Sequence, residues 1–197
     1  EGELSVMFAE AGCGKSLLAI QIADAIARGA ALKPLDTPAR RQKVIYVDLE
    51  SPPEQIRARY SYDDESRRSR PYKFPVNLTY SGQGGAGNAG IADIERMVTT
   101  NGAKVLIIDN IAHLMQQHSS GDAAGVMREL RRLKRVYGLS ILLLVHATAA
   151  DGRRELRARD MPFSAVMTAM ADNVFAIGRV GNDAAGRYIK HIRPGSA

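Results

Sequence analysis

Five residues near the start of the chain combine glycines, a lysine and a hydroxyl in an order that suits phosphate binding. The sequence GCGKS at 12–16 follows a short apolar run at 4–8 and precedes apolar residues with helical spacing that stop at Gly29. A strand, a small-residue loop and a helix joined in this way aim main-chain N–H groups at a bound phosphate. Lys15 can reach the β- and γ-phosphate oxygens, and the hydroxyl of Ser16 can ligate Mg²⁺.

This candidate phosphate-binding loop departs from the usual pattern at one position. Ala9 stands where the pattern has its first glycine, but this position only opens the turn, and a methyl group is a small intrusion there. The alternative is an ordinary strand-to-helix turn that happens to end in Lys-Ser, but the flanking strand and helix favour nucleotide binding. The residues that we expect to contact the nucleotide are Ala11, Gly12, Cys13, Gly14, Lys15, Ser16 and Leu17.

Two acidic residues each follow a predicted buried strand. Glu50 comes after the apolar run at 43–49, and Asp109 closes the run at 104–108. The carboxyl ends of parallel strands meet at one edge of an α/β sheet, where ligands bind. Glu50 could therefore act on a water beside the γ-phosphate, or it could simply complement the dipole of the helix that follows. Asp109 has the position of a Walker B aspartate, which holds Mg²⁺ together with the hydroxyl of Ser16.

A histidine and a group of arginines follow another predicted strand, 140–146. His146 could sense the γ-phosphate through a hydrogen bond, or it could be a strand-end histidine with a structural partner. The loop that follows, 147–164, is rich in arginine and suits contacts with the phosphate backbone of a nucleic acid. Its candidate DNA-binding residues are Arg153, Arg154, Arg157 and Arg159.

The bulk composition fits one globular domain with an anionic partner. The chain has 197 residues, 45% of them hydrophobic, which is enough for one α/β domain with a sizeable core. Its net charge of +6 favours an anionic ligand but indicates a nucleic acid only weakly. The single cysteine excludes an internal disulfide and fits the reducing cytoplasm. We find no membrane-spanning run and no signal peptide, and we expect residues 1–197 to be the single-domain core of a longer protein.

The order of the predicted elements indicates an α/β fold with a mostly parallel central sheet flanked by helices. The remaining predicted strands are 76–80, 171–178 and 187–193, and the remaining predicted helices are 91–100 and 122–137. The last two strands are expected to form an antiparallel hairpin around the turn at 181–186. On this hairpin, Lys190 and Arg193 carry charge that could reach the nucleotide of a neighbouring subunit. The segment 61–75 is polar and basic, and 112–121 is expected to be a polar loop.

These motifs, in this order, resemble the RecA-like P-loop ATPase superfamily. The resemblance rests on the sequences GELSVMFAEAGCGKS, VIYVDLE, VLIIDN and ILLLVH and on the C-terminal hairpin, and it covers essentially the whole chain. Within the superfamily, the chain is similar to RepA/DnaB-type replicative helicase cores, KaiC-like ATPases and AAA_25-like ATPase cores. The resemblance implies a RecA-like fold, Mg²⁺-dependent hydrolysis of ATP, assembly into a hexameric ring of identical subunits, and single-stranded DNA as a partner.

The resemblance also implies roles for individual residues. Glu50 matches the glutamate that polarises the attacking water, Asp109 matches the Walker B aspartate, and His146 matches the residue that couples nucleotide state to the DNA loop. Lys190 and Arg193 are similar to the basic finger residues that such proteins insert into the next subunit's site. The family usually places one residue between them. Two separate them here, so either residue can be the finger.

Three other functions are compatible with the same motifs. A KaiC-like regulatory ATPase would switch protein partners without acting on DNA. A small-molecule kinase would need an acceptor pocket and a lid, and the sequence has no clear lid. A nucleotide-binding assembly module would keep the phosphate-binding loop but hydrolyse ATP slowly or not at all.

Overall fold

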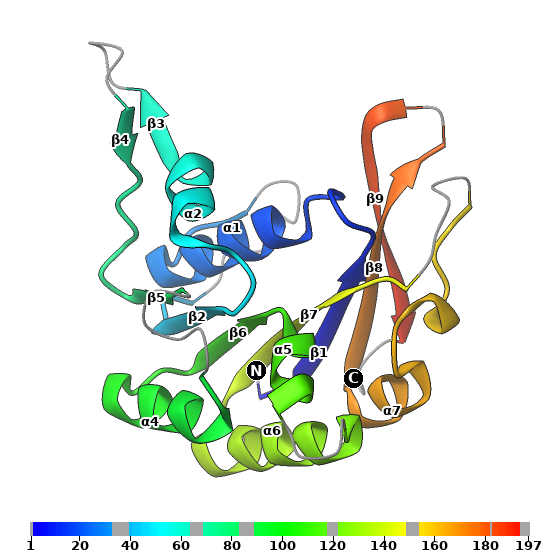
Figure 1. Ribbon diagram of the computed structural model, residues 1–197. Coiled ribbons are helices and arrows are strands. Elements are labelled where there is room, and N and C mark those ends of the chain that lie inside the picture. Colours follow the sequence, from blue (N-terminus) through cyan, green and yellow to red (C-terminus); the bar gives the residue numbers. More distant parts are fainter. Residues whose placement is uncertain are drawn as a thin grey trace.

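The computed structural model describes residues 2–32, 40–63, 69–82, 89–117, 122–148, 154–181 and 183–193, which form layers of helices around a sheet (Figure 1). The sheet has seven strands in the order β5-β2-β6-β7-β1-β8-β9. These strands are β1 (Leu4–Ala9), β2 (Val44–Asp48), β5 (Leu78–Ser81), β6 (Val105–Asp109), β7 (Ser140–His146), β8 (Asn173–Val180) and β9 (Asp183–Arg193). Neighbouring strands are parallel except for the antiparallel β8–β9 pair. The predicted α/β fold, with its mostly parallel sheet and C-terminal antiparallel hairpin, is therefore confirmed.

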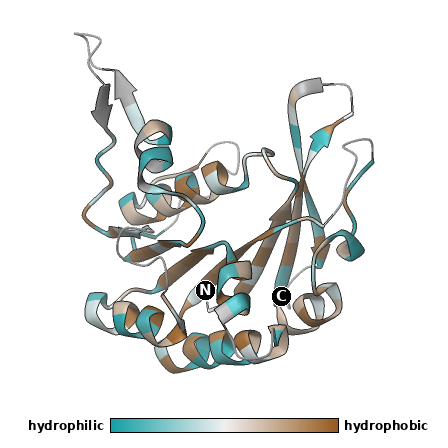
Figure 2. Cartoon of the chain, viewed as in Figure 1, coloured by the Kyte–Doolittle hydropathy of each residue, from teal (hydrophilic) through white to brown (hydrophobic). Residues whose placement is uncertain are grey.

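Nearly continuous apolar sequence explains why the central strands are buried on both faces. Every residue of β2 and β6 is buried. Side chains along a strand point alternately to opposite faces of the sheet. In β1, for example, Phe8 lies in one apolar core, whereas Met7 and Ala9 lie in the other. Figure 2 shows these strands as the hydrophobic centre of the molecule.

Amphipathic helices cover both faces of the sheet. Helix α1 (Lys15–Arg28) packs on one face, and α2 (Pro53–Arg59) follows β2. The helices on the other face are α4 (Ile91–Asn101), α5 (Ile111–Gln117), α6 (Ala123–Tyr137) and α7 (Ser164–Met170). In α6, Val126, Leu130 and Leu133 are buried at helical spacing, so that the arginines of this helix lie on its other sides.

Two segments differ from the sequence prediction. The sequence predicts a polar loop at 112–121, but residues 111–117 form α5, because Ile111, Leu114 and Met115 are buried at helical spacing. Residues 118–121 lie outside the described part of the chain. The polar segment 61–75 contains a small antiparallel ribbon of β3 (Ser61–Asp63) and β4 (Ser69–Pro71), which has no apolar alternation to reveal it.

Parallel pairing brings the carboxyl ends of four strands to the same edge of the sheet. In the β1–β7 register, Ala9 is opposite His146, and in the β2–β6 register, Asp48 is opposite Asp109. The loop after β1 and the residues after β2 and β6 must therefore meet at this edge. This is the edge at which open α/β sheets bind their ligands.

Candidate nucleotide-binding site

The loop between β1 and α1 depends on two glycines for its backbone conformation. Gly12 has φ of 72° and Gly14 has φ of 89°, values in the left-handed region that other residues rarely adopt. A Cβ placed at Gly14 would meet nothing within 4 Å, and one at Gly12 would lie 3.8 Å from Nη2 of Arg179. Backbone strain, and not lack of space, therefore requires glycine at both positions.

Helix α1 begins directly after this loop and leaves its amino end uncapped. Gly14 is the N-cap residue, so no side chain caps the helix, and the first turn contains no acidic residue. The first N–H groups of a helix lack partners within the helix, and their dipoles favour an anion. A phosphate group bound in the loop would supply the missing acceptor.

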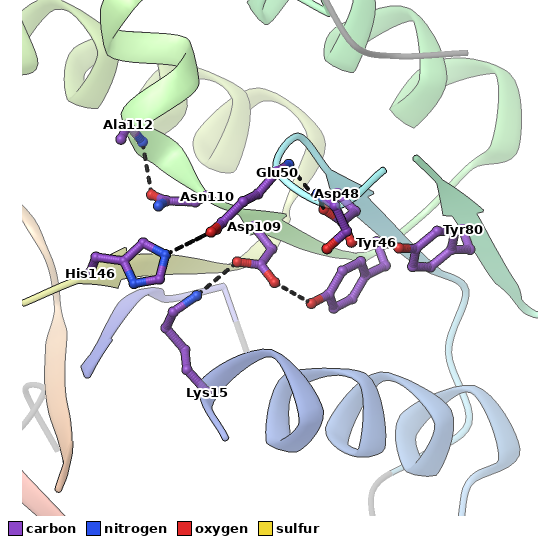
Figure 3. A network of polar contacts seen from close by, with 10 residues as sticks. Lys15, Tyr46, Asp48, Glu50, Tyr80, Asp109, Asn110, Ala112 and His146 are labelled. Atoms are coloured by element: carbon purple, nitrogen blue, oxygen red, sulfur yellow. Dashed lines mark hydrogen bonds and ion pairs between the residues drawn. The ribbon is translucent and has the colours of Figure 1, made fainter. Parts of the chain in front are cut away.

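A buried ion pair joins the loop lysine to the end of β6 (Figure 3). Nζ of Lys15 donates to Oδ1 of Asp109 at 2.8 Å, and the two side chains are only 4% and 2% exposed. The hydroxyl of Tyr46 donates to Oδ2 of the same carboxylate at 2.8 Å. Burial and the neighbouring Asp109 raise the pKa of Tyr46 well above its ordinary value, which keeps its donor proton in place.

A second, half-exposed pair lies beside the first. Nε2 of His146 lies 3.0 Å from both carboxylate oxygens of Glu50. This hydrogen bond is the main reason why the pKa of Glu50 falls to about 2, and the charge of Lys15 adds to it. Asn110, whose Oδ1 accepts the N–H of Ala112, also lowers the pKa of Glu50. Glu50 is therefore ionised at neutral pH.

A buried aspartate holds the turn that carries Glu50. Oδ1 of Asp48 accepts the main-chain N–H groups of Glu50 at 3.0 Å and of Ser51 at 2.8 Å. Its other oxygen accepts the hydroxyl of Tyr80 at 2.6 Å. Sequence analysis did not identify Tyr46, Asp48 or Tyr80. The two inward-facing tyrosines look like ordinary core positions, whereas Asp48 ends an apolar run as Asp109 does, and this signal could have found it.

The loop with Lys15, the hydrogen-bonded pair of Glu50 and His146, and α2 enclose a cleft of about 340 Å³. This volume falls within the range of small-molecule sites. Besides residues 10–17, Glu50 and His146, the cleft is lined by Ser51, Gln55 and Arg59. Gln55 and Arg59 are four residues apart on α2, so helical spacing after Glu50 could have identified them. No sequence signal points to Arg179, which β8 places beside Gly12.

The oxygen donors at this edge fit a Mg²⁺–nucleotide complex. Mg²⁺ prefers oxygen ligands and is usually bound through one or two protein groups together with phosphate oxygens and water. Ser16 and Lys15 line the cleft, and the buried Asp109 lies behind them in contact with Lys15. The described residues contain no group of three His, Cys, Asp or Glu side chains that could hold a metal ion without such additional ligands.

The remaining predicted site residues lie away from the cleft. Lys190 on β9 donates to Oε2 of Glu155 at 2.6 Å, and Nη1 of Arg193 contacts the carbonyl oxygen of Thr168. Neither residue lines the cleft.

The predicted DNA-binding arginines are only partly described. Arg154 binds both carboxylate oxygens of the buried Asp160, at 2.7 and 2.6 Å, so it already has a structural partner. Arg157 and Arg159 are exposed, and Arg153 lies outside the described residues.

The fold and this site together define a RecA-like P-loop ATPase, and comparison with known proteins identifies the family. The profile of the AAA_25 family, described as an AAA domain, matches residues 1–152, and the chain belongs to this family. The predicted superfamily is thus confirmed. A search of curated proteins finds no match.

Two archaeal proteins of known structure share the fold. A KaiC-like protein from Pyrococcus horikoshii has a TM-score of 0.62 and 16% identity, over 98% of this chain and 80% of its own. The flagellar accessory protein FlaH from Methanocaldococcus jannaschii has a TM-score of 0.64 and 15% identity, over 98% of this chain and 79% of its own. Identities this low establish likeness of fold and nothing more. No helix in the described ranges is long and apolar enough to cross a membrane.

Proposed function

We propose that this domain binds ATP with Mg²⁺ in the cleft and hydrolyses it. The observation that carries the proposal is the meeting of Lys15, Asp109 and Glu50 beside an uncapped helix terminus. Each of these side chains belongs to a different segment of the chain, and each has the chemistry that phosphoryl transfer needs. Such catalysis consists almost entirely of positioning and charge stabilisation.

ATP binding would exchange the partner of Lys15. In the described state its ammonium is neutralised by Asp109 at 2.8 Å. Lys15 would instead bind the β- and γ-phosphates. The carboxylate of Asp109 would then be released and would hold Mg²⁺ together with the hydroxyl of Ser16. Mg²⁺ would supply charge neutralisation on the β- and γ-oxygens. The hydroxyl of Tyr46 would keep Asp109 oriented throughout.

Glu50 would orient the attacking water. While His146 holds Glu50, the pKa of Glu50 is about 2 and it is ionised. Its contribution would be to accept a hydrogen bond from the water and to align the water with the γ-phosphate. His146 holds both oxygens of Glu50 and would have to release one of them first. We infer that His146 turns towards the γ-phosphate and so links nucleotide state to the segment that follows β7.

We further propose that hydrolysis takes place in a hexameric ring of identical subunits that acts on single-stranded DNA. Lys190 or Arg193 would act as the finger in a neighbour's cleft, since neither residue lines its own. Arg157 and Arg159 are exposed on the segment after β7 and would contact the DNA backbone. Arg154 would take no part in this contact, because it is paired with Asp160.

A KaiC-like regulatory ATPase is the second candidate. It is favoured by Arg154, which is engaged with Asp160 and therefore not directed at a nucleic acid. In this case the domain would hydrolyse ATP without any response to DNA. Charge reversal at Arg157 and Arg159 would then leave its activity unchanged.

Steady-state ATPase assays with and without single-stranded DNA test these proposals. We expect Lys15→Ala and Glu50→Gln to abolish turnover and Glu54→Gln, an exposed acid in the first turn of α2, to leave it intact. Nucleotide binding should survive Glu50→Gln. Turnover that is unaffected by Glu50→Gln would refute the proposed mechanism. DNA that neither binds nor changes the rate would favour the regulatory ATPase.

Mixing two inactive variants tests the finger. Glu50→Gln subunits keep their finger, and subunits with both Lys190→Ala and Arg193→Ala keep Glu50. If the finger acts in a neighbouring subunit, mixed assemblies regain activity at interfaces where the Glu50→Gln subunit faces an intact cleft. Each variant alone is the control. Mixtures as inactive as their components would contradict a finger supplied by a neighbour.

A further inference from the structure

A group of cations lies at the edge of the sheet opposite to the nucleotide cleft. Lys43 immediately precedes β2 and Lys104 immediately precedes β6, and the register pairs Val44 with Val105. Both lysines therefore stand at the amino ends of neighbouring parallel strands. Asp48 and Asp109 stand at the other ends of these strands, five residues further on, about 16 Å away at 3.3 Å per residue.

The two lysines line a hollow of about 440 Å³ together with Arg40 and Arg41. The other lining residues are glycine, serine and glutamine, and among the residues that the structure describes no carboxylate lines this hollow. Four cations around one concave surface repel one another unless an anion offsets them. Such a surface attracts anions because its walls focus the positive potential.

Helix ends hold three of these cations in place. Nζ of Lys43 donates to the carbonyl of Asn101 at 3.0 Å, and Nζ of Lys104 donates to that of Tyr137 at 2.9 Å. Nε of Arg41 lies 3.4 Å from a carbonyl in the last turn of α1. Each contact uses one donor, whereas an ammonium has three N–H donors and a guanidinium has five.

Capping of helix carboxyl ends accounts for only part of this arrangement. It explains why a lysine or arginine stands at the ends of α4, α6 and α1. It does not explain why Arg40 joins the other three around the same hollow. It also uses only one printed donor contact for each of the three held cations, while all four cations line the same hollow.

We propose that this hollow, formed by Arg40, Arg41, Lys43 and Lys104, binds clustered phosphate groups. The source is either a nucleic acid backbone or a free polyphosphate. Guanidinium groups bind phosphate in a bidentate manner, and ammonium groups bind it as point charges. The site lies across the sheet from the nucleotide cleft, so both can be occupied together. The proposal does not rest on ATP hydrolysis.

The nucleic acid backbone is tested by the binding of labelled oligo-dT of about 20 nucleotides. Binding is measured by fluorescence anisotropy between about 50 and 200 mM salt. For a single strand, each phosphate contact adds about −0.7 to the slope of log K against log salt. The double variant Lys43→Gln/Lys104→Gln should therefore reduce the slope by about 1.4. Binding of inorganic tripolyphosphate to the same variants, measured by calorimetry, tests the second source.

Further variants separate site binding from general electrostatics and from loss of a helix cap. Arg40→Gln/Arg41→Gln leaves the ends of α4 and α6 untouched and should weaken binding as the lysine variant does. Because Arg41 contacts the last turn of α1, Arg40→Gln alone is included as well, and it should weaken binding without the loss of any helix-end contact. Arg96→Gln/Arg128→Gln removes the same charge from exposed positions and should have little effect. ATPase activity should be unchanged in all of these variants. The ATPase assay therefore tests the proposed nucleotide site, and the binding assays test the hollow, so that each proposal can fail independently.

The ligand that loses affinity in both site variants but not in the control identifies the source. Equal losses in site and control variants would show that only net charge matters, and the proposal would be wrong. Binding of both ligands that is insensitive to all four substitutions at the site would refute it as well.

Discussion

The buried pair of Lys15 and Asp109 makes a quantitative prediction about stability. Its side chains are 4% and 2% exposed, so removing one partner leaves a charge in the interior. Breaking a buried ion pair in this way costs about 3–5 kcal/mol. For a domain of this size each kcal/mol lowers the melting temperature by about 2–4 °C, so we expect Lys15→Met to melt about 6–20 °C below the original protein.

The double variant distinguishes a coupled pair from two independent residues. Lys15→Met/Asp109→Leu removes both charges, and replacing both partners by apolar residues is often nearly neutral. The hydroxyl of Tyr46 would lose its acceptor, which costs about 1–3 kcal/mol. We therefore expect the double variant to be more stable than either single variant, and the addition of Tyr46→Phe to recover part of the remaining loss.

Urea unfolding of the single, double and triple variants without nucleotide measures these free energies. The control is the exposed pair of Arg96 and Asp93 at 2.8 Å, whose loss should cost about 0–1 kcal/mol. Single-variant losses that simply add in the double variant would mean that the two charges do not stabilise each other. A Lys15→Met protein as stable as the control would refute the assignment of a buried pair.

Three further predictions concern the pH profile, the loop and the hairpin. Because the pKa of Glu50 is about 2, protonation of Glu50 should not lower kcat/KM at any pH above about 4. In His146→Ala, the pKa of Glu50 should rise towards its ordinary value of 4.5, and a pH profile of kcat/KM should show the fall in rate at correspondingly higher pH. Gly14→Ala forces a side chain to φ of 89° and should cost about 1–2 kcal/mol in a thermal melt, with weaker nucleotide binding; an unchanged melt would contradict the strain. Tyr188→Phe removes the acceptor of the Leu156 N–H at 2.7 Å and should cost about 1–3 kcal/mol, with faster hydrogen exchange at that amide.

Most of the fold could be predicted from local sequence. The runs before Asp48 and Asp109 contain few polar residues, and such runs are typical of strands that are buried on both faces of a parallel sheet. Glycines with positive φ mark where the helices α1 and α6 end, at Gly29 and Gly138, because these conformations are strained for other residues. Helix α5 was missed because Gln and His residues around Leu114 obscure its short buried stripe.

Within the site, the sequence alone determined which residue types were present and on which strand ends they stood. Lys15 after a glycine loop, and acids after two apolar runs, follow from short-range patterns and from the rule that parallel strands end together. Only the tertiary structure decided the partners. Glu50 meets His146 across 96 residues, and Tyr46 meets Asp109 across 63, because strand order and register bring them together. Contacts of this kind depend on which strands are neighbours, and no local pattern encodes that choice.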